Sequence, residues 1–285
     1  MISTNYLKYI KSFIFVFLIE LFTNTTFAVS DLPFNSLSYP VLATLDDNSS
    51  GSGFYLSDKG NFYFVTARHV IFNNELTLKS KTITLSSCCS PDISKKIVFK
   101  INLEELYKSN LIKFHEIHDV TIIYLGKISN NTVTYGNYIK RISSETCSTT
   151  SSDTLWIKKF NDIPIGNEIY IFGFPNSLGL VKNQQLDYAA PLLRKGIVAG
   201  KNVHNNTIII DCPVYQGNSG GPVLVIEKMN TSTTTFLPIG IVTQFVPFVE
   251  EWVNNRYENV KNITISNSGY SIVEPIDIVL ELLFK

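Results

Sequence analysis

One short run of residues limits the folds open to this chain more than any other: GNSGGP, at residues 217–222. A serine flanked by glycines suits nucleophilic catalysis, because its hydroxyl stands clear of the backbone and nearby N–H groups can stabilise an oxyanion. The same letters fit the G-x-S-x-G pattern of α/β-hydrolases, in which the catalytic histidine follows the serine. Here all four histidines precede Ser219, and this order excludes the α/β-hydrolase fold.

Two segments upstream of Ser219 complete a candidate catalytic set. Residues 62–71 read FYFVTARHVI, an apolar strand that runs into a turn carrying His69. Asp119 begins DVTIIYL, whose β-branched and aromatic residues are typical of a buried strand. The order His69, Asp119, Ser219 fits a triad in which the histidine is the general base and the aspartate fixes its tautomer. A subtilisin-like order would need an aspartate before His69, and the aspartates found there lie in polar, loop-like stretches.

Further motifs, in the same order along the chain, resemble those of trypsin/chymotrypsin-fold serine peptidases, and most of all the bacterial trypsin-like, HtrA-type branch. The resemblance covers nearly the whole chain after residue 35. It rests on Gly51-Ser52-Gly53-Phe54, Thr66-Ala67-Arg68-His69-Val70, Asp119-Val120-Thr121-Ile122-Ile123, Gly173-Phe174-Pro175, Arg194-Lys195-Gly196-Ile197-Val198, Asp211 through Pro222, Ile239-Gly240-Ile241-Val242 and Glu274-Pro275-Ile276-Asp277-Ile278-Val279.

The resemblance implies an all-β fold: a double six-stranded antiparallel β-barrel, chymotrypsin-like, with a C-terminal helix. Short β-branched and aromatic runs separated by Asn, Ser, Gly and Thr clusters favour an all-β barrel or sandwich on their own. The expected strands are 39–45, 53–56, 62–66, 82–85, 96–101 and 120–125, followed by 168–172, 196–199, 207–210, 221–226, 237–243 and 270–272. Segments 104–114 and 279–283 are expected to be helical.

The domain organisation follows from composition along the chain. Residues 1–28 read as a secretory signal, with two lysines, an apolar run and a Thr26-Phe27-Ala28 cleavage site. The polar stretch 130–153 marks a linker, so the first barrel is expected over 29–145 with His69 and Asp119. The second barrel and the helix are expected over 146–285 with Ser219. The 257 residues left after cleavage suit one protease domain without the PDZ domain that HtrA proteins usually carry.

The signal segment and the charge composition also limit the cellular location and the partners that we expect for this protein. Glu20 interrupts the apolar run of the signal, so we expect no stable membrane insertion after cleavage and a secreted or periplasmic protein. The 24 basic and 24 acidic side chains give no basic excess, so no nucleic-acid partner is expected, only polypeptide substrates.

Cysteine usage leaves more than one possibility open. The four cysteines, Cys88, Cys89, Cys147 and Cys212, allow three sets of two disulfides in an exported protein. No C-x-x-C pair or cluster of His and Cys suggests zinc. We therefore expect no metal and no cofactor.

The nucleophile loop carries two further expectations. The backbone N–H groups of Gly217 and Ser219 are expected to form the oxyanion hole. In trypsin-like zymogens an aspartate before the serine pairs with a newly cut N-terminal amine, and here that position is Asn218. Activation by insertion of a new N-terminus is therefore not expected.

The resemblance also places a substrate pocket at Pro213, Gln216, Thr243 and Phe245. Pro213 stands where tryptic enzymes have the aspartate that binds a basic P1 side chain, so Lys or Arg would enter an uncharged pocket. Val242 replaces the histidine of glutamyl endopeptidases, and Phe245 replaces a glycine at the pocket entrance. A small or aliphatic P1 preference is expected.

The resulting hypothesis is an exported serine endopeptidase that works through a His-Asp-Ser triad and an acyl-enzyme. The alternative is a binding module that keeps the protease fold with weak or no turnover, its pocket filled by Phe245. The presence of His69, Asp119 and Ser219 together favours the enzyme, since a binding module has no physical reason to keep all three. Esterase activity on small acyl groups could accompany the peptidase activity.

Overall fold

The computed structural model describes residues 36–176, 182–228, 234–253, 256 and 260–284. The expected signal segment 1–28 lies outside these residues. Within the described part, no helix is long and apolar enough to cross a membrane.

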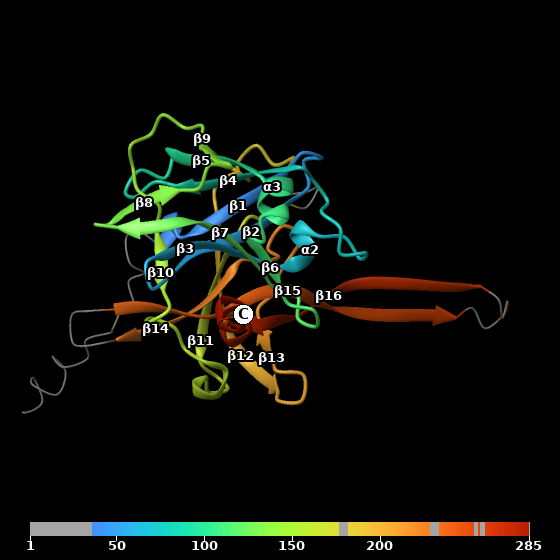
Figure 1. The fold of residues 1–285 in the computed structure, drawn as a ribbon. Coiled ribbons are helices and arrows are strands. Elements are labelled where there is room, and N and C mark those ends of the chain that lie inside the picture. Colours follow the sequence, from blue (N-terminus) through green and yellow to red (C-terminus); the bar gives the residue numbers. More distant parts are fainter. Residues whose placement is uncertain (1–35, 177–181, 229–233, 254–255, 257–259, 285) are drawn as a thin grey trace, which may run out of the picture. The chain divides into compact units, whose positions relative to one another are not determined.

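Residues of the first half form a curled ten-stranded sheet (Figure 1). Its main path runs β6-β7-β3-β2-β1-β4-β5-β9, with β8 pairing with β7 and β10 pairing in parallel with β2. The strands are β1 (Pro40–Leu45), β2 (Ser50–Asp58), β3 (Asn61–Thr66), β4 (Thr82–Cys88), β5 (Lys96–Asn102), β6 (Ile112–Phe114), β7 (Thr121–Ser129), β8 (Thr132–Tyr135), β9 (Ile139–Arg141) and β10 (Ser151–Asp153).

Residues of the second half form a closed six-stranded barrel in the order β11-β12-β13-β16-β15-β14. The strands are β11 (Glu168–Gly173), β12 (Leu192–Asn202), β13 (Thr207–Asp211), β14 (Pro222–Lys228), β15 (Thr234–Val253) and β16 (Lys261–Pro275). Short helices complete the described fold: η1 (Ser36–Ser38), α2 (Arg68–Ile71), α3 (Leu103–Lys108), η2 (Phe160–Asp162) and the C-terminal α5 (Ile276–Phe284).

The expected all-β fold class is confirmed: two curled sheets, antiparallel except where β10 pairs with β2, are followed by a C-terminal helix. Each expected strand overlaps an observed one. The first sheet has ten strands instead of six, because short strands such as β6 and β8 extend its edge. The expected helix 104–114 is shorter, since the chain leaves α3 and pairs β6 with β7. The expected domain boundary at residue 145 falls between β9 and β10 and stays a prediction.

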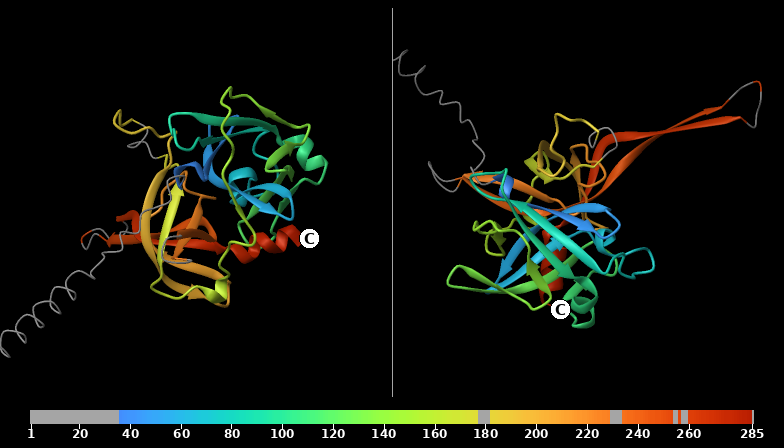
Figure 2. Two further views of the ribbon diagram at one scale, coloured as in Figure 1. Left: turned by 90° about the vertical axis from the view of Figure 1, so that its left-hand side faces the viewer. Right: turned by 90° about the horizontal axis from the view of Figure 1, so that it is seen from above.

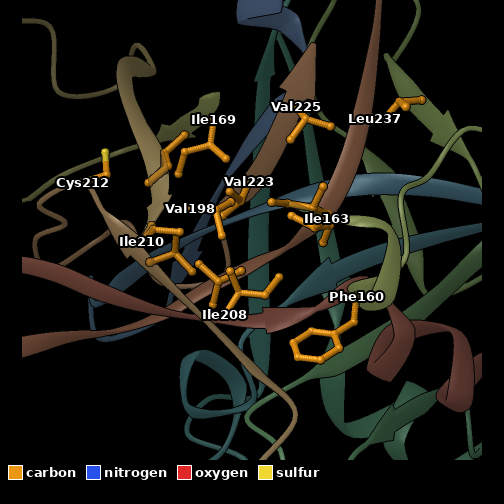
Figure 3. Close-up of a cluster of buried hydrophobic side chains, with 14 of the residues drawn as sticks. Phe160, Ile163, Ile169, Val198, Ile208, Ile210, Cys212, Val223, Val225 and Leu237 are labelled. Carbon is orange, nitrogen blue, oxygen red and sulfur yellow. The ribbon is translucent and has the colours of Figure 1, made fainter. Parts of the chain in front are cut away.

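Alternating β-branched residues build the core of the closed barrel (Figure 3). Successive side chains of a strand point to opposite faces, so residues two apart share the interior. Ile169 and Ile171 of β11, and Ile208 and Ile210 of β13, are fully buried in this way. Each such side chain contributes roughly 1.5–3 kcal/mol by leaving water. This packed core fixes the strand ends from which the loops of the candidate site emerge.

Strands β15 and β16 continue as a two-stranded hairpin past the rest of the described fold (Figure 2). Their pairing runs from Gly240↔Pro275 to Val253↔Lys261. Sequence reasoning expected only 237–243 and 270–272. The sequence did not predict the rest of β15 because it contains Pro247, Glu250 and Glu251, and proline and glutamate are depleted in strands.

One disulfide joins Cys89, just after β4, to Cys147, with the two Cα atoms 5.8 Å apart. Cys88 and Cys212 are free and buried. None of the three two-disulfide sets is therefore formed, although one of them contains this pair. The disulfide ties the segment between β9 and β10 back to the first sheet.

We expect the double variant Cys89→Ala/Cys147→Ala to be less stable than the wild type. The cross-link spans 58 residues, and the chain-entropy model gives about 4 kcal/mol for a loop of that length. Urea titration should record this loss of unfolding free energy. Reductant should lower the stability of the wild type by the same amount and leave the double variant unchanged; equal stability of oxidised wild type and variant would contradict the expectation.

Candidate active site

Strand pairing brings His69 and Asp119 together. His69 lies in α2 directly after β3, and Asp119 precedes β7, which pairs with β3 through Thr66↔Thr121. Asp119 Oδ2 lies 2.5 Å from His69 Nδ1, and Asp119 Oδ1 accepts the His69 backbone N–H at 2.8 Å. The Arg68 N–H donates to the Asp119 carbonyl at 3.2 Å. Both carboxylate oxygens are thus engaged by His69, which fixes the imidazole ring and its tautomer.

The environment keeps Asp119 ionised. Burial opposes its charge, but the hydrogen bonds from the His69 side chain and backbone, and the charges of His69 and Arg68, outweigh burial and hold the pKa of Asp119 below its usual value. The His69 side chain is 47% exposed and that of Asp119 26%. A charged, half-buried carboxylate behind a partly exposed imidazole can stabilise an imidazolium while the ring remains open to substrate.

The conformation of the candidate nucleophile loop, residues 215–221, depends on two glycines with positive φ, Gly217 at 89° and Gly220 at 83°. A Cβ on Gly217 would lie 2.2 Å from the Phe174 carbonyl oxygen, so no other residue fits there. Within the loop the Asn218 N–H donates to Tyr215 O at 3.0 Å. Its side-chain Oδ1 accepts the Tyr215 N–H at 3.2 Å, so Asn218 orders the loop from inside.

Backbone hydrogen bonds occupy some N–H donors of this loop and leave others, among them those of Gly217 and Ser219, available. The N–H of Gly220 donates to Val242 O at 2.7 Å, and that of Gly221 donates to Asn218 O at 2.9 Å. The N–H groups of Gly217 and Ser219 donate to no acceptor among the described residues. These are the two donors expected for an oxyanion hole.

The loop of Ser219 lies against the elements that carry His69. A Cβ on Gly51 would meet Val70 Cγ2 at 2.6 Å and Ser219 O at 3.2 Å, so only Gly51 separates Val70 from the Ser219 backbone. A Cβ on Gly220 would lie 2.7 Å from the Ala67 nitrogen. Within the described structure Ser219 Oγ forms no hydrogen bond with His69; such bonds often tighten only when substrate is bound.

Ser52 of β2 is a residue that sequence reasoning missed. Its backbone N–H donates to Ser219 O at 2.8 Å, and its hydroxyl donates to Gly217 O at 2.6 Å and accepts the Phe174 N–H at 3.0 Å. Ser52 is fully buried. It therefore holds the carbonyls of both expected oxyanion residues and fixes the Gly217–Asn218 and Ser219–Gly220 peptide planes. Only its place in the GSGF motif marked it in the sequence.

The expected pocket residues do not all meet in one cavity. A cavity of about 540 Å³ brings Thr243 together with His69 and Asp119, and its lining is completed by Asn202, Asn205, Thr207, Ile209, Gln244, Ile272 and Glu274. Ser219 and the other three expected pocket residues are not part of its lining. Pro213 is half-buried and Gln216 is exposed, and both precede Ser219 in the chain. Phe245 is 38% exposed and pairs with Ser271 across the hairpin.

Metal ligands can be assessed from the same geometry. In the described part of the chain, no group of three or more His, Cys, Asp or Glu side chains is arranged to hold a metal ion. The chemistry available to this arrangement is that of a serine hydroxyl, an imidazole base and backbone N–H donors.

Comparison with known proteins adds independent information. The model of the trypsin-like peptidase domain family matches residues 51–228, more than half of the chain. A protein of Arabidopsis thaliana named "Putative protease Do-like 12, mitochondrial" is 29% identical, over 38% of this chain and 25% of its own length. The chain thus matches about a quarter of that curated relative.

One solved structure supports the fold. A mutant of human heparin binding protein (CAP37) matches with a TM-score of 0.52 and 10% identity over 89% of this chain and 92% of that one. The serine endoprotease from Yersinia pestis has a TM-score of 0.47 and 17% identity over 89% of this chain and 66% of that one. At such identities the first match speaks for the fold alone.

We expect Ser52→Ala to weaken both the fold and the site, because it leaves the buried Gly217 carbonyl and the Phe174 N–H without their partner. An unsatisfied buried polar group costs about 1–3 kcal/mol. Denaturant titration should show a loss in that range, and Ser49→Ala, in an exposed turn, serves as the matched control. Equal stability of the two variants would show that the hydroxyl of Ser52 does not hold the loop.

Proposed function

Because the chain belongs to the trypsin-like peptidase domain family, a family of serine-type endopeptidases, we propose that it hydrolyses peptide bonds through His69, Asp119 and Ser219. The observation that carries this proposal is the double engagement of His69 by the Asp119 carboxylate, next to a glycine-bounded serine loop. A histidine fixed in this way and left open to solvent on its other side is what a general base requires.

The reaction that this geometry supports has two halves. Ser219 Oγ attacks the carbonyl carbon of the substrate while His69 Nε2 accepts its proton, and Asp119 stabilises the imidazolium through Nδ1–H. The N–H groups of Gly217 and Ser219 stabilise the tetrahedral oxyanion. His69 then gives the proton to the leaving amine, an acyl-enzyme remains on Ser219, and water activated by His69 releases it.

Export is part of the proposal. The disulfide between Cys89 and Cys147 supports it, because disulfides persist mainly in oxidising compartments outside the cytosol. A secreted or periplasmic location, with polypeptides as substrates, fits both this bond and the signal-like features of residues 1–28.

We expect a fluorophosphonate probe to label the purified protein on Ser219. The activated hydroxyl displaces fluoride from phosphorus, whereas an unactivated serine reacts slowly. Gel fluorescence should show labelling of the wild type, none of Ser219→Ala, and none after heat denaturation. A folded wild type that stays unlabelled and leaves peptide libraries uncut would favour the binding module instead.

We expect substrates with Ala, Val or another modest apolar P1 residue to be cleaved faster than those with Lys, Arg or Glu. Pro213 and Val242 provide no charge or histidine for an ionised side chain, so such a side chain loses its hydration without a partner. Discrimination of about 1–3 kcal/mol is usual for the fit of an apolar pocket.

A peptide-library profile measures this preference, with Phe245→Gly as the companion variant. That variant should accept larger aromatic P1 residues if the ring of Phe245 narrows the entrance. A profile dominated by cleavage after Arg or Lys would overturn the expected specificity.

A further inference from the structure

A buried carboxylate that the proposed reaction does not use lies beside Asp119. Glu274, at the end of β16, is 7% exposed and lines the same cavity as His69 and Asp119. Acidic side chains are almost never buried unless they are paired. The contacts of Glu274 therefore call for an explanation.

Glu274 binds two neighbouring groups with its two oxygens. Its Oε2 lies 2.7 Å from Nδ1 of His118, and its Oε1 accepts the backbone N–H of Asp119 at 3.5 Å. The first contact is short and the second is long. Together they join one carboxylate to the imidazole of His118 and to the backbone N–H of Asp119.

The backbone of Glu274 is itself closely fixed. It pairs with Ile241 of the adjacent strand β15, and a Cβ on Gly240 of that strand would lie only 2.2 Å from the Glu274 carbonyl oxygen. The carboxylate therefore projects from a rigid barrel strand and not from a loop. A group on such a strand can hold a loop in position.

The loop that carries Asp119 is held from its other side by the first sheet. Arg68 Nη1 donates to the carbonyl of His115 at 2.5 Å and to that of Glu116 at 2.7 Å. The His118 N–H donates to His115 Nδ1 at 3.0 Å, and the Val120 N–H donates to His118 O at 2.9 Å. Arg68 and Glu274 thus fix the loop from opposite halves of the chain.

Stability alone does not account for Glu274. Burial and the nearby Asp119 charge raise the pKa of Glu274, and the His118 charge and hydrogen bonds offset this only in part. Two carboxylates close together in a buried site disfavour one another's ionisation. Replacing such a buried ionic pair by an apolar residue is often neutral or stabilising. The placement points to a role in the site.

We propose that Glu274 is a positioning residue for the proposed triad: it holds the His118–Asp119 peptide so that both oxygens of Asp119 stay aligned with His69. This inference rests on the proposed function for its catalytic consequence. Asp119 bonds to a side chain and a backbone N–H of one residue, so a small rotation of its peptide would break one of the two bonds. A misplacement of about 1 Å can cost roughly 100-fold in rate.

The test compares three variants of the full chain. Glu274→Met removes both acceptors while filling the volume, so the variant is expected to fold. Glu274→Gln keeps an oxygen for the Asp119 N–H and is the conservative rescue. Glu281→Gln is the matched control, because Glu281 Oε2 lies 3.5 Å from His115 of the same loop and has no contact with Asp119.

The kinetic readout is the split between kcat and KM on one peptide substrate. We expect Glu274→Met to lower kcat by up to about 100-fold with KM unchanged. Glu274→Gln should lie closer to the wild type than to Glu274→Met, and Glu281→Gln should match the wild type. A Glu274→Met variant with wild-type kcat, or one whose loss lies wholly in KM, would overturn the proposal.

A second readout does not require turnover. The proton shared by His69 Nδ1 and Asp119 Oδ2 should give a far-downfield proton NMR resonance in the resting protein, and Glu274→Met should shift or broaden it while Glu281→Gln leaves it in place. An unchanged resonance in Glu274→Met would also overturn the proposal. If the wild type shows the resonance yet neither reacts with fluorophosphonate nor cleaves peptides, the proposed function fails while this comparison still decides the role of Glu274.

Discussion

Backbone groups of the two halves of the chain meet directly at the nucleophile loop, and the rest of the site depends on that close approach. A Cβ on Gly220 would lie 2.2 Å from the Ser52 carbonyl oxygen, and one on Gly51 would crowd both Val70 and Ser219 O. Side chains larger than hydrogen would push the halves apart. The glycines near Ser219 therefore do more than expose a hydroxyl: they allow the loop to bond to the first sheet.

That approach explains why Ser52 matters to a loop more than 160 residues away. Two of its bonds run to carbonyls of the nucleophile loop, and a third runs to the Phe174 N–H. Carbonyl oxygens held in this way set the direction of the peptide planes. The N–H groups of Gly217 and Ser219 share their peptide planes with the carbonyls of Gln216 and Asn218, which accept the N–H groups of Asn176 at 2.8 Å and Gly221 at 2.9 Å. These donors are therefore oriented before any substrate arrives, and preorganised donors stabilise charge without reorganisation.

Local pattern predicted much of this fold. β3 and β7 are β-branched, aromatic runs, and the sequence predicted both strands and the contact between His69 and Asp119 at their ends. In each case the residue type or a short motif carries the signal, because strand formation and turn chemistry depend on neighbours in sequence.

Contacts between residues distant in sequence could not be predicted in the same way. Nothing local distinguishes Glu274 from an acid that starts a helix, and its partner His118 lies 156 residues away. Likewise, four cysteines gave three sets of pairs, and only the fold selects Cys89 and Cys147. The hairpin of β15 and β16 was underestimated because its stability comes from cross-strand pairs, which a single strand does not reveal.

Several of these long-range contacts support the same loop, the one that carries Asp119. Asp119 sits on a loop, and loops are the least rigid part of a fold. Arg68 holds that loop from the first sheet, and Glu274 holds it from the closed barrel. A carboxylate supported from two sides can keep one geometry while the imidazole in front of it gains and loses a proton. The junction of the two halves therefore supplies the rigidity that the loop of Asp119 lacks by itself.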